Sequence, residues 1–146
     1  MTKTIVIAGI VSFALGMTVS AAELPHALVE PYLQAQVILV NDETKGIDVA
    51  AKAVEASALK LGKDAAAVAS GAHKLSVART ITQARAAFGE LSVALEAYVD
   101  KTKATFPADV HLAYCPMEDK PWLQKGDVIK NPYFGSEMID CGTIKK

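Results

Sequence analysis

The stretch TITQARAAFGELSVALEAY, residues 80–98, is the clearest fold signal in this chain of 146 residues. Its larger apolar residues recur at intervals of three or four and form a single seam: Ile81, Ala84, Phe88, Leu91, Leu95 and Tyr98. This spacing places them on one face of an α-helix, with the charged residues elsewhere. Thr80 followed by Gln83 is typical of a helix-capping box. The stretch therefore predicts a long helix that packs one face on a core.

Shorter apolar seams precede this stretch. They predict helices over residues 28–39, 43–61 and 64–75. Asn41 or Asp42 suits the N-cap of the second helix, Gly62 suits its end, and Gly71 weakens the third. Because four helices joined by short loops pack most simply side by side, we expect a mainly α fold, an antiparallel four-helix bundle over residues 23–106.

Beyond the helical part, residues 107–146 change character and predict a small loop or β-hairpin cap on the same single domain, residues 23–146. Residues 110–114 and 138–144 suit short strands, and the stretch between them is rich in Pro, Gly, Asn and Asp. A loop of this length inside a compact domain is usually tied down. Candidate ties are a disulfide, a metal, or the packing of Trp122, Tyr133 and Phe134 as structural anchors.

The N-terminal segment predicts export. Lys3, the apolar run at residues 5–19 and the small residues up to Ala22 match a signal peptide over residues 1–22, with an uncleaved anchor as the alternative. After cleavage, no other segment is apolar enough to span a membrane. We therefore expect a periplasmic or secreted protein. The formal net charge of −1 gives no basic surface for nucleic acid.

The sulfur-bearing residues gather in the last part of the chain. Cys115, Met117, Met138 and Cys141 lie there, with His111 nearby. Thiolate and thioether sulfurs are soft donors that favour Cu(I). In an extended segment, residues 111, 115 and 117 share one face. The pattern therefore predicts a Cu(I) site of two or three sulfurs, with His111 as an auxiliary ligand.

An alternative reading of the same residues needs no metal. Outside the cytosol two thiols tend to pair, and a Cys115–Cys141 disulfide would exclude a thiolate copper site. Met117 and Met138 would then be packing residues. No third group orients Cys115 and His111 as a nucleophile and base, so we do not expect an enzyme. Of the two arginines, Arg79 and Arg85, we expect Arg85 to be the one that holds the C-terminal tail on the helices.

The tail resembles that of a bacterial exported family of unknown function. The resemblance rests on Tyr-Cys-Pro-Met at residues 114–117, Asn-Pro-Tyr-Phe-Gly at residues 131–135 and Met-x-x-Cys-Gly at residues 138–142. Members of that family also occur joined to periplasmic adaptor subunits of heavy-metal and copper efflux pumps. The resemblance implies a soft-metal role and an efflux-system membrane or adaptor protein as partner. We therefore expect Cu(I) binding or transfer, with a disulfide-stapled protein-interaction module as the alternative.

Overall fold

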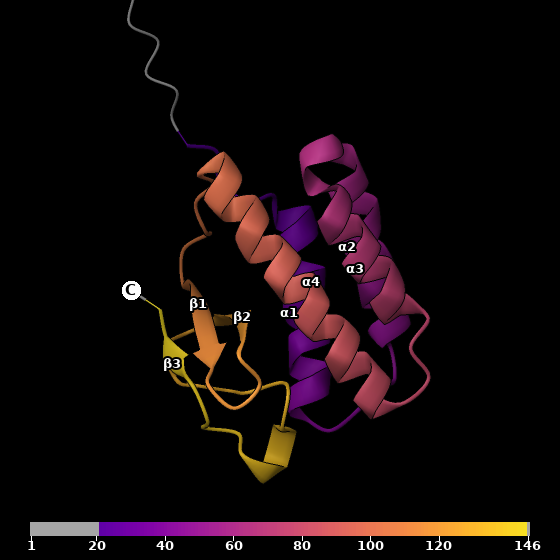
Figure 1. Cartoon of the computed structure of the whole chain (residues 1–146), viewed down its shortest axis with the longest axis vertical. Coiled ribbons are helices and arrows are strands. Elements are labelled where there is room, and N and C mark those ends of the chain that lie inside the picture. Colours follow the sequence, from indigo (N-terminus) through magenta and orange to yellow (C-terminus); the bar gives the residue numbers. More distant parts are fainter. Residues whose placement is uncertain (1–20, 146) are drawn as a thin grey trace, which may run out of the picture.

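The computed structural model describes residues 21–145, and Figure 1 shows their arrangement. The four α-helices are α1 (His26–Val40), α2 (Ile47–Lys60), α3 (Ala66–Ser76) and α4 (Ile81–Thr102). The strands are β1 (Val110–Cys115), β2 (Lys120–Lys125) and β3 (Thr143–Ile144), and short 3₁₀ turns lie at Lys63–Ala65 and Gly135–Glu137. The strands form one antiparallel sheet in the order β2-β1-β3.

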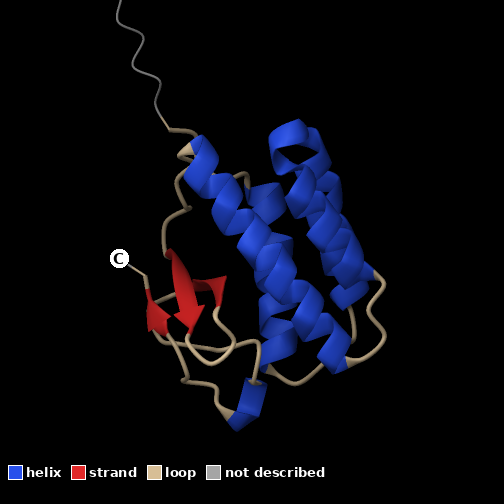
Figure 2. Cartoon of the chain, viewed as in Figure 1, coloured by secondary structure: helices blue, strands red, loops and turns tan. Residues whose placement is uncertain are grey.

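The prediction of a mainly α four-helix bundle with a small cap is wrong, because the chain has a mixed α and β fold. Helices make up 54% of it, and the sheet has three strands. The sheet lies beside α1 and α4 rather than across the end of a bundle, as Figure 2 shows, and β2 contacts both helices. The error lies in β2, which carries Pro121 and a lysine at each end and so lacks a strand pattern. Proline is tolerated here because β2 is an edge strand.

The helix α4 follows its seam closely. Phe88 and Leu91 are fully buried, and the Thr80 hydroxyl accepts a hydrogen bond from the backbone N–H of Gln83 at 3.2 Å. The glycine that weakens the α3 pattern has a packing role. A Cβ atom at Gly71 would lie 2.8 Å from the Leu91 Cα, so glycine lets α3 and α4 approach closely.

The predicted start of the second helix is too early. Its N-cap residue is Gly46, while Asn41 caps the C-terminus of α1. Asp42 is not a cap either. Its carboxylate accepts hydrogen bonds from Ser136 and Arg85, and so connects the helices to the C-terminal segment.

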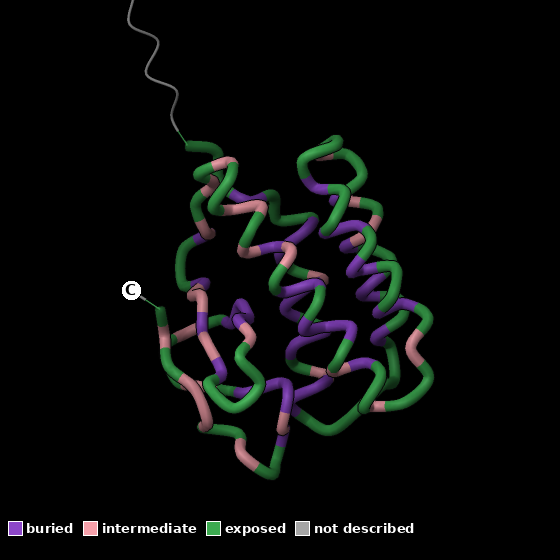
Figure 3. Tube along the Cα trace, in the orientation of Figure 1, coloured by how far each residue is buried: buried purple, intermediate pink, exposed green. Residues whose placement is uncertain are grey.

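The edge strand β2 is buried from both sides, and Figure 3 shows the buried stretch beside the helices. The backbone N–H of Leu123 donates to the Tyr32 hydroxyl of α1 at 3.2 Å. The Gln124 amide donates to the carbonyls of Gly126 and Val128 at 3.0 and 2.8 Å. The segment that follows β2 therefore folds back over it and shares the core with α1 and α4.

The predicted leader, residues 1–22, lies outside the described residues except for its last two. The Ala22 carbonyl accepts a hydrogen bond from the Thr105 N–H at 3.0 Å. Among the helices within residues 21–145, none is both long enough and apolar enough to cross a membrane.

Candidate functional site: a cysteine pair beside the sheet

The two cysteines lie together although 26 positions separate them in the sequence. Cys115 ends β1 and is fully buried, while Cys141 precedes β3 and is half-buried. Because β3 pairs with β1, with Tyr114 opposite Thr143, the chain returns Cys141 to the end of β1. Both thiols are free, and the two cysteines lie near each other. Burial and then the neighbouring Cys115 raise the pKa of the Cys141 thiol.

Asn131 holds this pair from the loop between β2 and β3. Its side chain is fully buried. Its Nδ2 group donates to the Cys115 Sγ atom at 3.2 Å and to the Cys141 carbonyl at 2.6 Å, while its Oδ1 atom accepts from the Tyr133 N–H at 2.8 Å. One amide thus fixes the positions of both cysteines and of the following turn.

Aromatic rings support the pair. Trp122 and Tyr133 are buried and meet edge to face with centroids 6.0 Å apart, whereas Phe134 is only partly buried. The Tyr133 hydroxyl donates to the Pro121 carbonyl at 2.5 Å. Gly142 lies against the indole, since a Cβ atom there would come within 2.6 Å of Trp122 Cη2. The residue that follows Cys141 is therefore packed on Trp122 of β2.

The other predicted copper ligands are placed differently. Met117 lies in the turn between β1 and β2 and is 67% exposed, so it does not continue the strand face of Cys115. His111 stands opposite Gln124, four residues before Cys115, which is about 13 Å along a strand. Met138 is half-buried, and its carbonyl accepts from the Cys141 N–H at 3.1 Å. Within residues 21–145, no group of three His, Cys, Asp or Glu side chains is placed to hold a metal.

A polar clamp fastens the cysteine-bearing segment to the helices. Arg85 of α4 donates to the Pro132 carbonyl at 3.0 Å and to the Asp42 carboxylate at 2.5 Å. Ser136 donates to the same carboxylate through its hydroxyl and its N–H at 2.5 and 3.1 Å. The Ser136 hydroxyl and then the Arg85 guanidinium hold the pKa of Asp42 below its usual value. The prediction that Arg85 docks the tail on the helices agrees with these contacts. The sequence did not indicate that Asp42 also joins the helices to the tail.

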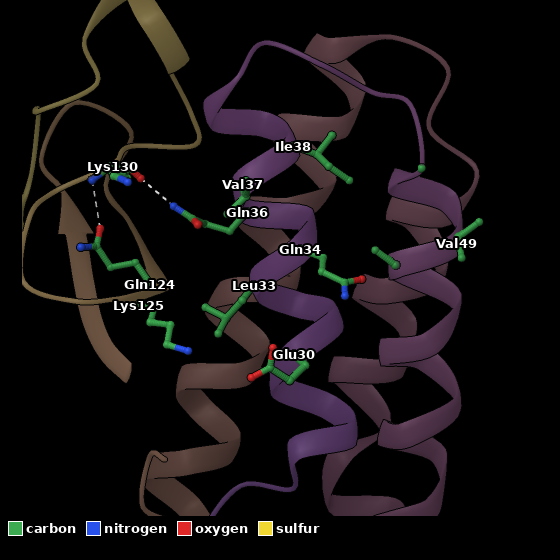
Figure 4. Close-up of a pocket in the computed structure, with 12 residues that line it drawn as sticks. Glu30, Leu33, Gln34, Gln36, Val37, Ile38, Val49, Gln124, Lys125 and Lys130 are labelled. Carbon is green, nitrogen blue, oxygen red and sulfur yellow. Dashed lines mark hydrogen bonds between the residues drawn. The ribbon is translucent and has the colours of Figure 1, made fainter. Parts of the chain in front are cut away.

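A second feature that the sequence did not indicate is a groove of 740 Å³ over α1, shown in Figure 4. Its floor is the exposed face of α1, and its walls are the start of α2 on one side and β2 with Lys130 on the other. The one available signal was Val37 and Val49, which lie outside the apolar seams and are 51% and 68% exposed.

Comparison with known proteins adds no relative. No protein-family model, curated protein or solved structure matches the chain. The fold and site therefore define the protein only as a mixed α and β domain in which a buried and a half-buried cysteine lie near each other. The resemblance of its tail to an exported family stays a prediction.

Proposed function

We propose that the protein is a disulfide-stapled binding module that acts outside the cytosol. The observation that carries this proposal is that the free thiols of Cys115 and Cys141 lie near each other, as a pair close to a disulfide. Asn131 already holds both cysteines, so little rearrangement separates the thiols from a bond. Closing a loop of this length stabilises a fold by about 3 kcal/mol when the bond adds no strain.

The contacts around the pair support a structural bond more than a metal site. A disulfide would join β1 to the segment before β3. Without it, β3 pairs with β1 through only two residues. The donors that would complete a larger copper shell are placed elsewhere, with Met117 exposed in a turn and His111 far along β1. The module would then act through its surface, and the cysteines would keep that surface in shape.

Cu(I) binding is the second candidate, and one observation favours it. Both thiols are free and adjacent, and the turn that carries Met138 lies beside them. Two or three soft sulfur ligands suit Cu(I). In that case Cys115 and Cys141 would bind the ion as thiolates and Met138 would be the thioether. An envelope efflux system, suggested by the tail motifs, would be the setting.

One titration separates the two candidates. The chain, exported with its own leader, is reduced, then equilibrated in glutathione buffers of increasing oxidising strength, and its thiols are counted. We expect both thiols to disappear together at a potential below about −300 mV, as structural disulfides do, so that the pair is already oxidised in the most reducing glutathione buffer. In parallel, the reduced chain competes with the chelator bicinchoninate for Cu(I). Thiols that persist under oxidising buffers, together with stoichiometric Cu(I) uptake, would reject the staple and favour the copper site.

A further inference from the structure

The groove over α1 has an aliphatic lining. Leu33, Val37 and Ile38 of α1 and Val49 and Ala50 of α2 supply its apolar surface, and no aromatic side chain is among its described lining residues. Val37 and Val49 are 51% and 68% exposed. Their uncovered hydrocarbon area is unfavourable in water, so a ligand that covers it would gain binding free energy. The missing rings favour a flexible aliphatic ligand over a flat aromatic one, since there is no platform for stacking.

The buried polar groups beside the groove are already satisfied by the protein. The Gln36 amide donates to the Lys130 carbonyl at 2.8 Å, and the Gln124 side chain accepts from the Lys130 N–H at 3.1 Å, as Figure 4 shows. No buried side-chain nitrogen or oxygen within residues 21–145 lacks a partner. The two buried amides therefore offer a ligand no unpaired group, whereas the exposed Gln34 amide on α1 stays open to one.

Two ammonium groups are also open to a ligand, and they carry charge. Lys125 and Lys130 are exposed on the β2 wall of the groove, and neither belongs to an ion pair within residues 21–145. Glu30, the one carboxylate among the described lining residues, has the His26 imidazole 3.7 Å away. The charge beside the aliphatic floor is therefore positive by one, which favours an anion.

The size of the groove distinguishes a small ligand from a protein partner. Its floor runs from Glu30 to Ile38, which is about 12 Å of helix. A stable protein interface covers about 800 Å² on each partner, far more than this floor offers. A volume of 740 Å³ instead falls in the range of small-molecule sites, about 300–1,000 Å³.

We propose that this groove binds a free medium-chain fatty acid. The aliphatic chain lies along α1 between Val37 and Val49, and the carboxylate faces Lys125 and Lys130. The inference goes beyond the proposed function, since neither cysteine of the disulfide proposal is among the described residues that line the groove.

The test is calorimetric titration of the full chain with dodecanoate, below its micelle concentration, and with dodecyltrimethylammonium of the same chain length. Dodecanoate should bind saturably with one molecule per chain, and the cation should bind at least tenfold more weakly. The double variant Lys125→Gln with Lys130→Gln should weaken dodecanoate binding about fivefold to tenfold, because partly exposed charge contacts contribute about 0.2–1 kcal/mol each.

Matched variants separate the groove from general effects. Val37→Asp places a carboxylate on the floor and should abolish binding, whereas Val93→Asp, at a comparably exposed valine of α4, should not change it. Lys63→Gln with Lys103→Gln removes two lysines that do not line the groove and should also have no effect. Circular dichroism of each variant confirms that it is folded.

Absence of saturable dodecanoate binding would overturn the proposal, as would equal binding of the cation or full binding by Val37→Asp. The titrations are repeated with reduced and oxidised protein. Dodecanoate binding by a chain whose thiols never pair would leave the groove proposal standing and reject the staple. Disulfide formation without dodecanoate binding would reject the groove proposal alone.

Discussion

Replacing Asn131 by alanine should destabilise the reduced protein by about 2–4 kcal/mol. The substitution leaves the Cys141 carbonyl and the Tyr133 N–H without the partners that now lie at 2.6 and 2.8 Å. A buried backbone group that loses its partner costs about 1–3 kcal/mol. Tyr133 is buried and should cost the larger share, while the half-buried Cys141 carbonyl regains some hydration from water. The lost contact with the Cys115 sulfur adds little, because thiols are weak acceptors.

Urea unfolding measures this loss through the shift of the midpoint at constant slope. Asn41→Ala is the matched control, since Asn41 is exposed and should change stability by less than about 0.5 kcal/mol. The Asn131 variant should also form the disulfide more slowly, because the amide that contacts both cysteines is then missing. A loss below about 1 kcal/mol, with disulfide formation at the normal rate, would refute the role assigned to Asn131.

Three further predictions concern the packing and the charges. Gly71→Ala should cost about 1–3 kcal/mol in urea unfolding, because its Cβ meets the α4 backbone at 2.8 Å, whereas Gly89→Ala meets only a flexible lysine side chain and should cost less. Asp42, whose pKa is lowered, contributes stability that is complete above about pH 3.9 and is lost as pH falls through its folded pKa. Asp42→Asn should therefore flatten the acid side of the stability profile, and an unchanged profile would exclude the clamp with Arg85. The pKa of Cys141 is raised, so its contribution is complete below about pH 8.5 and is lost as pH rises through its folded pKa. Reduced protein should accordingly lose more stability in alkali than oxidised protein, and equal losses in the two forms would contradict this.

The helices could be predicted from the sequence because their signals are local. The seam from Ile81 to Tyr98 and the Thr80 cap need no information from the rest of the chain, and α4 begins at Ile81 as expected. Residues 110–114 were also predicted as a strand and form most of β1, but β2 could not be predicted, since it gains its stability from α1 and α4 rather than from its own residues. The role of Gly71 was invisible for the same reason, because the close approach depends on α4.

The sequence indicated which cysteines form the candidate site, but it did not indicate how the residues around them are arranged. The concentration of sulfur in the tail pointed to Cys115 and Cys141, and the structure brings them together. The extended-strand argument failed for Met117, because β1 ends at Cys115 and a turn follows. Asn131 appeared in the tail only as a turn residue, and its contacts with both cysteines depend on a loop whose path no local pattern specifies.

The most direct test of the proposed disulfide is the state of the two cysteines after the predicted export. The chain is expressed with its own residues 1–22, recovered from the periplasm of a bacterial host, alkylated without reduction and digested for mass spectrometry. The account predicts no alkylated cysteine and one cross-linked peptide pair that joins Cys115 to Cys141. Recovery of both cysteines in alkylated form, from a chain that has lost its leader, would contradict it.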